Sequence, residues 1–198
     1  MSATGRKKTN RKPGRQPERK RGLARKKKAD ESPVRNDQDL LHCTLAPSGS
    51  KSIVLPTSTI AEITDYEPPA PLDNTPDWLL GQVEWEDWQV PVISYGALVD
   101  GEEPESATGR SRIMVLKSLS NTARVPYIGV LVRQIPRLAK LAESDLEVAE
   151  QENPSPTVHS MVKVSGQDAV VPDLDRLAQL VGHAAYGTVE KGETPTQA

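Results

Sequence analysis

The stretch that decides the fold of this chain is GQVEWEDWQVPVIS, residues 81–94. Side chains alternate between the two faces of a strand, so Trp85 shares a face with the valine two positions earlier. The alternation restarts at Trp88, after the pair Glu86-Asp87. This pattern predicts a β-hairpin with Glu86-Asp87 as its loop. Two-residue loops prefer Asn-Gly or Asp-Gly, because the second position usually needs a positive φ, so Glu-Asp points to a functional turn or to a longer loop.

Short apolar runs bounded by turn residues recur on both sides of this hairpin and predict further strands. They are Leu40–Leu45, Ile53–Leu55, Ile60–Tyr66, Ile113–Leu119, Tyr127–Val132, Val158–Val164 and Ala169–Val171. Helical structure is expected at Asp77–Leu80, ended by Gly81, at Tyr95–Val99, and after Asp173 as far as Gly182. Residues 101–111 and 150–157 read as loops. Many short strands and a single convincing helix indicate an all-β fold of the barrel class.

Charge divides the chain into an arm and a body. Residues 1–35 carry 14 Lys or Arg against 3 acids, a net charge of +11, whereas the remainder carries 11 basic and 24 acidic side chains, a net charge of −13. The arm has too few apolar residues to offset the entropy of ordering. We therefore predict a disordered basic arm over residues 1–37, a folded domain over 38–184 and a flexible tail over 185–198.

The sequence contains little that indicates catalysis or metal binding. His42, His159 and His183 lie in different segments without metal-ligand spacing, and Cys43 alternates with leucines as a buried residue does. Phosphate-binding glycine loops are missing from the sequence, and the acids beside Trp85 favour a solvated turn over a cation site. No enzyme and no cofactor is predicted. The single cysteine, the lack of an apolar run of membrane-spanning length and the lack of a secretory signal fit a cytosolic protein.

The order of several segments resembles that of a known family. They are Val54–Pro56 with Ile60–Ile63, Thr75–Gly81 (TPDWLLG), Val90–Ser94 (VPVIS), Ile128–Val132 (IGVLV) and Ala169–Leu177 (AVVPDLDRL). Together they resemble the CheW-like adaptor family of bacterial chemosensory systems, over roughly Leu40 to Val181. Within that family the chain is most similar to the divergent adaptors of type IV pilus chemosensory clusters, which control twitching motility.

The resemblance implies two interleaved, SH3-like β-barrels of about five strands each, with a short C-terminal helix and no catalysis. It implies an adaptor that joins the cytoplasmic tip of a chemoreceptor to the CheW-like regulatory domain of a histidine kinase. The kinase-facing surface is expected around Glu62, Ile63, Leu80 and Gly81, with the two apolar side chains as anchors and Glu62 as a rim charge. Because alternation alone cannot place them, Ile63 and Leu80 are equally compatible with core positions.

The chain departs from the family pattern at three charged positions. Glu86 replaces an Arg, Asp87 replaces the turn Gly, and Arg133 replaces an Asp. We therefore expect Glu86 to be a partner-binding residue that faces a basic group on a variant partner, or that has lost one of the usual contacts. The alternative is that Trp85 and Trp88 pin the hairpin as a cross-strand aromatic pair, while the acids only keep it soluble.

The basic arm has no counterpart in the family pattern. It is a candidate for non-specific contact with a polyanion such as nucleic acid or anionic lipid. It could instead cover the acidic body, or be an extension upstream of the natural start. The competing function is therefore a small β-barrel that binds nucleic acid through residues 1–35. The acidic body and the lack of any Phe count against that function.

Overall fold

The computed structural model describes residues 40–119, 125–149 and 155–187, and the structural statements below concern those residues. The predicted arm, residues 1–37, and the part of the predicted tail from residue 188 onward lie outside them. Within the described ranges no helix is both long and apolar enough to cross a membrane.

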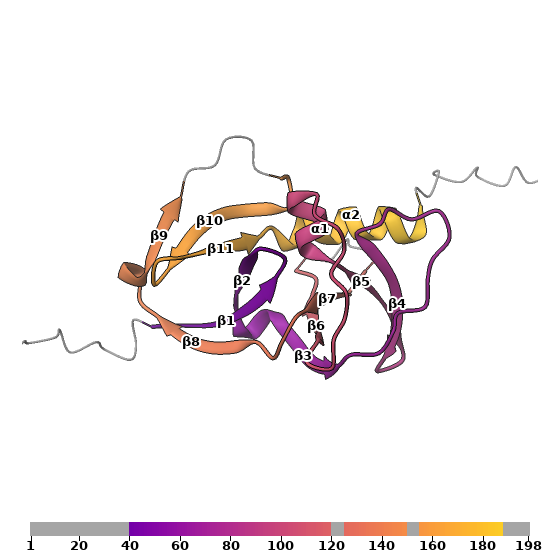
Figure 1. Cartoon of the computed structure of the whole chain (residues 1–198), viewed down its shortest axis with the longest axis horizontal. Coiled ribbons are helices and arrows are strands. Elements are labelled where there is room, and N and C mark those ends of the chain that lie inside the picture. Colours follow the sequence, from indigo (N-terminus) through magenta and orange to yellow (C-terminus); the bar gives the residue numbers. More distant parts are fainter. Residues whose placement is uncertain (1–39, 120–124, 150–154, 188–198) are drawn as a thin grey trace, which may run out of the picture. The chain divides into compact units, whose positions relative to one another are not determined.

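The middle of the chain forms a five-stranded sheet with the order β3-β6-β7-β5-β4 (Figure 1). Its strands are β3 (Ile60–Asp65), β4 (Leu79–Trp85), β5 (Trp88–Ile93), β6 (Arg112–Lys117) and β7 (Tyr127–Val132). Only the pair β5 and β7 is parallel in this sheet. The crossover that leaves β5 begins with α1 (Tyr95–Asp100), which Ser94 caps at its N-terminus and Gly101 caps in the left-handed conformation at its C-terminus.

The two ends of the described chain meet in a six-stranded sheet with the order β8-β1-β2-β11-β10-β9. Its strands are β1 (Leu41–Ser48), β2 (Lys51–Pro56), β8 (Arg137–Leu141), β9 (Leu146–Ala149), β10 (Val158–Val164) and β11 (Gln167–Pro172). The parallel pair β2 and β11 joins the N-terminal hairpin to the C-terminal strands. Short 3-10 turns, Thr57–Thr59 and Glu143–Asp145, connect β2 to β3 and β8 to β9.

Three apolar clusters hold these elements together. The five-stranded sheet surrounds Val90, Val92, Ile113, Val115 and Leu131. The six-stranded sheet surrounds Cys43, Leu45, Val54, Leu141, Val162, Val164 and Ala169. A larger cluster joins side chains of both sheets to α2 (Leu174–Tyr186), which buries Leu174, Leu177, Ala178 and Val181 at helical spacing. Each fully buried Leu or Val contributes roughly 1.5–3 kcal/mol, so this shared cluster makes the two sheets one folded body.

This mainly β arrangement of two sheets with a C-terminal helix confirms the predicted fold class. The predicted hairpin is also confirmed, because Trp85 pairs with Trp88 across the turn Glu86-Asp87. Both turn residues have positive φ, 43° at Glu86 and 64° at Asp87, as a two-residue loop requires.

The helical turn predicted at Asp77–Leu80 is wrong, because β4 already begins at Leu79. Gly81 does not cap a helix but lies at a bulge inside the strand, with φ 133°. There the Pro-rich connector between β3 and β4, residues 66–78, runs along the strand, and Ala70 exchanges two backbone hydrogen bonds with Gln82, of 2.8 and 2.9 Å. A Cβ at Gly81 would lie 2.2 Å from the Ala70 carbonyl oxygen, so the position requires glycine.

The predicted helix end at Gly182 is also wrong, since α2 continues to Tyr186 and is capped by Gly187. Gly182 is buried inside the helix, where packing outweighs its low helix propensity. The sequence patterns also gave no elements between Arg133 and Ala149, where the structure has β8 and β9.

Candidate functional site

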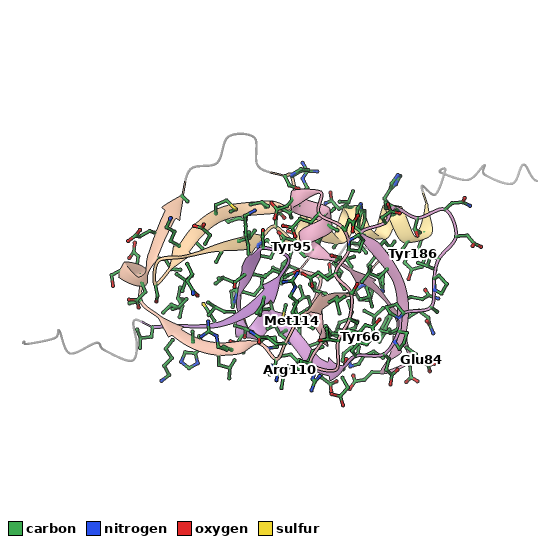
Figure 2. The ribbon with its side chains drawn as sticks, in the orientation of Figure 1. Tyr66, Glu84, Tyr95, Arg110, Met114 and Tyr186 are labelled. Atoms are coloured by element: carbon green, nitrogen blue, oxygen red, sulfur yellow. The ribbon has the colours of Figure 1, made fainter. Side chains whose placement is uncertain are left out.

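The first candidate surface lies where the two edge strands of the five-stranded sheet come close to one another. β3 and β4 are its two edge strands, yet the indole Nε1 of Trp85 on β4 donates a 2.7 Å hydrogen bond to Glu62 Oε2 on β3. The two edges therefore face one another across an open seam. Figure 2 shows the Glu84 side chain projecting from the β4 edge. Below, "the seam" means the gap between β3 and β4 with the side chains that line it.

The residues predicted to face the kinase all lie on or beside this seam. Glu62 and Ile63 belong to β3, Leu80 and Gly81 to β4, and Glu86 to the hairpin turn. Positions almost 20 residues apart in the sequence, on β3 and β4, are thus brought to the two facing edges of one sheet, with Glu62 tied directly to β4. Their common position confirms neither a partner nor a role for any of them.

The two apolar residues of this set differ in burial. Ile63 is 36% exposed and pairs with Met114, so it points away from the cluster inside the sheet. Leu80 is half-buried and packs against that cluster. A bulge between Ile60 and Glu62 sets this difference, because the extra residue shifts which side chains face inward. Ile63 is therefore the accessible apolar group, whereas Leu80 also serves the core.

The tryptophans of the hairpin pack against a third aromatic ring. Trp85 and Trp88 both make edge-on contacts with Tyr127 on β7, at ring-centroid distances of 4.8 and 5.7 Å. Such contacts stabilise by about 0.5–1.5 kcal/mol each beyond simple burial. Tyr127, which the sequence patterns did not single out, therefore anchors the turn that presents Glu86 and Asp87 to solvent.

A second exposed apolar surface lies on the six-stranded sheet, in the segment that the sequence patterns left unassigned. Leu138 on β8 is 76% exposed, and Ile135 just before the strand is 62% exposed. Ile135 borders a hollow that it shares with Arg110 and Arg112, whereas Leu138 borders another beside His42. An exposed aliphatic group beside arginines, as at Ile135, is a combination found at the surfaces that proteins use to bind one another.

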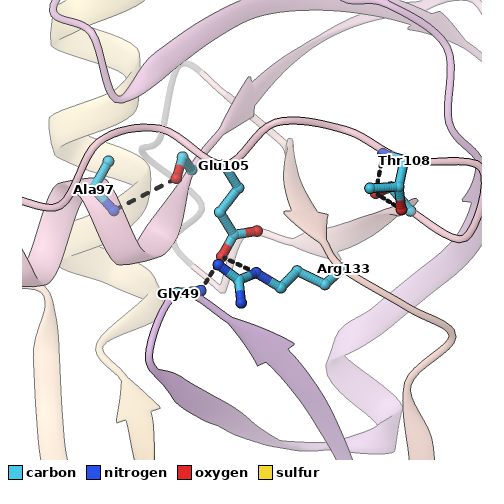
Figure 3. A network of polar contacts seen from close by, with 7 residues as sticks. Gly49, Ala97, Glu105, Thr108 and Arg133 are labelled. Carbon is cyan, nitrogen blue, oxygen red and sulfur yellow. Dashed lines mark hydrogen bonds and ion pairs between the residues drawn. The ribbon is translucent and has the colours of Figure 1, made fainter.

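A buried carboxylate joins parts of the chain that are distant in sequence. Glu105, in the loop after α1, has a side chain only 4% exposed; its Oε1 accepts a hydrogen bond from the Gly49 amide in the β1–β2 turn (Figure 3). The Arg133 guanidinium lies 3.8 Å from the same oxygen. Burial raises the pKa of Glu105 to about 7. The positive charge of Arg133 lowers this pKa in part, and the negative charge of Glu102 raises it further. Arg133, which stands where the family pattern has Asp, thus forms an ion pair with a buried acid of the same chain.

The described residues offer no group of three or more His, Cys, Asp or Glu side chains arranged to hold a metal ion. Cys43 is buried, and burial raises the pKa of its thiol, which disfavours the reactive thiolate. The buried Tyr95 hydroxyl donates to the Thr157 carbonyl at 3.0 Å, so it links α1 to the C-terminal strands. These buried groups have structural explanations.

Exposed apolar side chains on both sheets, Ile63 and Leu138, favour a protein-interaction module. Comparison with known proteins identifies the family: residues 42–181 match the model of the CheW-like domain. The chain therefore belongs to the CheW-like domain family, the non-enzymatic scaffold and adaptor proteins of chemosensory signalling.

A solved structure agrees with this assignment at the level of the fold. The scaffolding protein TtCheW from Thermoanaerobacter tengcongensis superimposes with a TM-score of 0.59 at 15% sequence identity. The likeness covers 70% of this chain and 87% of that one. No curated protein matches the chain by sequence.

Proposed function

We propose that this chain couples a chemoreceptor to a histidine kinase by binding the cytoplasmic tip of the first and the CheW-like regulatory domain of the second. An adaptor needs two docking surfaces. The observation that carries the proposal is that exposed apolar side chains occur on both sheets, Ile63 on the five-stranded sheet and Leu138 on the six-stranded sheet. The receptor tip and the kinase domain that it would join are both cytoplasmic, so we place the function in the cytoplasm, at receptor arrays.

In this proposal the kinase docks at the seam. Ile63 supplies the apolar anchor, and the exposed carboxylates of Glu62 and Glu86 supply rim charges that orient the partner. Leu80 and Gly81 shape the surface from below, one by filling the sheet interior and the other by holding the connector against β4. The receptor then binds around Leu138 and Ile135.

Co-purification from the native cells tests the proposal. The full-length chain is compared with Ile63→Asp, Leu138→Asp and the control Val148→Asp, which alters a side chain on β9 that is as exposed as Leu138 and more exposed than Ile63. Loss of a central apolar anchor typically costs more than 2 kcal/mol, so we expect at least a tenfold lower kinase yield with Ile63→Asp and a comparable fall in receptor with Leu138→Asp. Equal yields from all three variants would contradict the assignment.

Two further proposals rest on sequence alone. Control of type IV pilus motility follows from the resemblance to pilus-cluster adaptors, and is tested by twitching of cells that lack the gene. Contact of residues 1–35 with a polyanion follows from their net charge of +11, and predicts nucleic acid or lipid in the purified full chain that is lost steeply with added salt.

A further inference from the structure

The acidic charge of the body is concentrated in one part of the sequence. Residues 52–109 contain twelve Asp or Glu and no Lys, Arg or His. This range includes both edge strands of the five-stranded sheet, the connector between them and the hairpin turn. The opposite charge is concentrated in residues 1–35, with its net of +11. One chain therefore carries two complementary, separate charged regions.

The seam gives the acidic region a shape that can receive a peptide. Between the edges lies a hollow of about 140 Å³, large enough for an extended side chain. Its floor and wall are apolar, and its rim is acidic. The lining residues are Val83, Ile113, Val115 and Trp85 on the floor and wall, and Asp65, Glu67 and Glu84 with Thr64 around the rim.

Of the three acids at the rim, one forms an ion pair within the described residues, and the other two remain available to bind a basic group. Arg112 pairs with Asp65 at 3.2 Å. Glu67 and Glu84 are exposed and have no ion-pair partner among the described residues. Within those residues β3 pairs only with β6, so its outer edge also offers unpaired backbone groups.

An apolar hollow with a carboxylate rim matches the chemistry of lysine and arginine. Their aliphatic stems pack against apolar surface while the charged heads stay at the rim. An extended backbone can in addition form hydrogen bonds with an open strand edge, which is a common mode of peptide recognition. The seam is thus suited to an extended basic segment, and unsuited to nucleic acid or an acidic lipid surface, which its carboxylates repel.

We propose that the seam, when no kinase is docked there as proposed above, is a docking site for a lysine- and arginine-rich peptide, and that its occupant is the chain's own residues 1–35. Charge complementarity selects this segment, since its 14 basic side chains are the largest basic group in the sequence. Length permits it, because 35 residues of extended chain span on the order of 115 Å. A tethered segment also has a high effective concentration, so weak individual contacts suffice.

Protection from trypsin tests the proposal on the full-length chain, purified free of nucleic acid. The seam variant Glu67→Gln with Glu84→Gln is compared with the control Glu147→Gln with Asp175→Asn, in which both altered acids are also exposed. A synthetic peptide of residues 1–35 gives the unprotected rate. At low salt we expect the wild type and the control to be cut in residues 1–35 about fivefold more slowly than the peptide, and the seam variant almost as fast as it. Equal rates for the two variants, or a wild type as sensitive as the peptide, overturn the proposal.

Carbodiimide cross-linking of a mixture of ¹⁵N-labelled and unlabelled chains identifies the occupant. Links from the lysines of residues 1–35 to Asp65 or Glu67 within one copy support the proposal. Links that join only differently labelled copies assign the seam to a second copy instead, and so contradict the same-chain occupant. Links spread evenly over Glu147, Asp175 and the seam contradict the site itself.

Discussion

Replacement of Glu105 by Gln should stabilise the protein above neutral pH and remove a pH dependence of its stability. The carboxylate is buried, its Oε2 has no hydrogen-bond partner within the described residues, and its ion pair with Arg133 is long, at 3.8 Å. The rise of its pKa from 4.5 to about 7 corresponds to about 3 kcal/mol at 1.36 kcal/mol per pKa unit. Because the surrounding loop can relax and admit water, we expect about 1–2 kcal/mol.

The sign follows from the direction of the shift. A carboxyl group whose folded pKa lies above its unfolded value contributes its stability below pH 4.5, and loses that contribution as the pH rises through about 7. Gln keeps an acceptor for the Gly49 amide without the buried charge. The variant should therefore gain over the wild type mainly between pH 5 and 8.

Urea unfolding at pH 5, 6, 7 and 8 measures this difference in the free energy of unfolding. The exposed neighbour Glu103 provides the control, because Glu103→Gln removes the same charge from a solvated position in the same loop. If Glu105→Gln and the wild type keep a constant difference across the four pH values, the idea of a buried, partly protonated carboxyl group is refuted.

Four other substitutions test the edges of the five-stranded sheet. Gly81→Ala should lower stability by about 3 kcal/mol or more, because its Cβ overlaps the connector backbone, whereas Gly109→Ala, with open space around it, should leave the melting temperature nearly unchanged. Replacing Glu86-Asp87 by Asn-Gly should stabilise the hairpin by roughly 1 kcal/mol in thermal unfolding, since both positions have positive φ; a loss of stability would contradict the turn geometry. Glu86→Arg should change the affinity for the kinase at least several-fold, and unchanged binding would remove Glu86 from the proposed interface. Trp85→Phe deletes the indole donor at the seam and should cost about 1 kcal/mol in chemical unfolding, with no effect expected if the two edges are not linked.

The sequence predicted those elements whose pattern is local. The hairpin around Glu86-Asp87 follows from strict alternation, and the helix after Asp173 from its cap and its apolar spacing. β8 could not be predicted in this way, because most of its side chains are exposed. Its apolar residues also do not occupy every second position, as those of a half-buried strand would. It forms as a partner for β1, a long-range contact that no local pattern records.

The candidate site was predictable in position but not in detail. The family resemblance predicted a site at Glu62, Ile63, Leu80 and Gly81, which lie on β3 and β4, but the bulge that turns Ile63 outward does not follow from any local sequence pattern. Glu105 lay within a charged stretch that predicts an exposed loop, and only its long-range contact with the Gly49 turn makes it buried. Both features depend on contacts between segments about 50 residues apart.

The interleaving of the two sheets has a consequence for how the protein is made. All five strands of one sheet lie between residues 60 and 132, so that sheet can assemble while synthesis is still in progress. The β1–β2 hairpin, made first, gains its neighbour β11 only after residue 172 has been translated. Until then its apolar edge is open to wrong partners, so the earliest strands of the chain are the ones most in need of a chaperone.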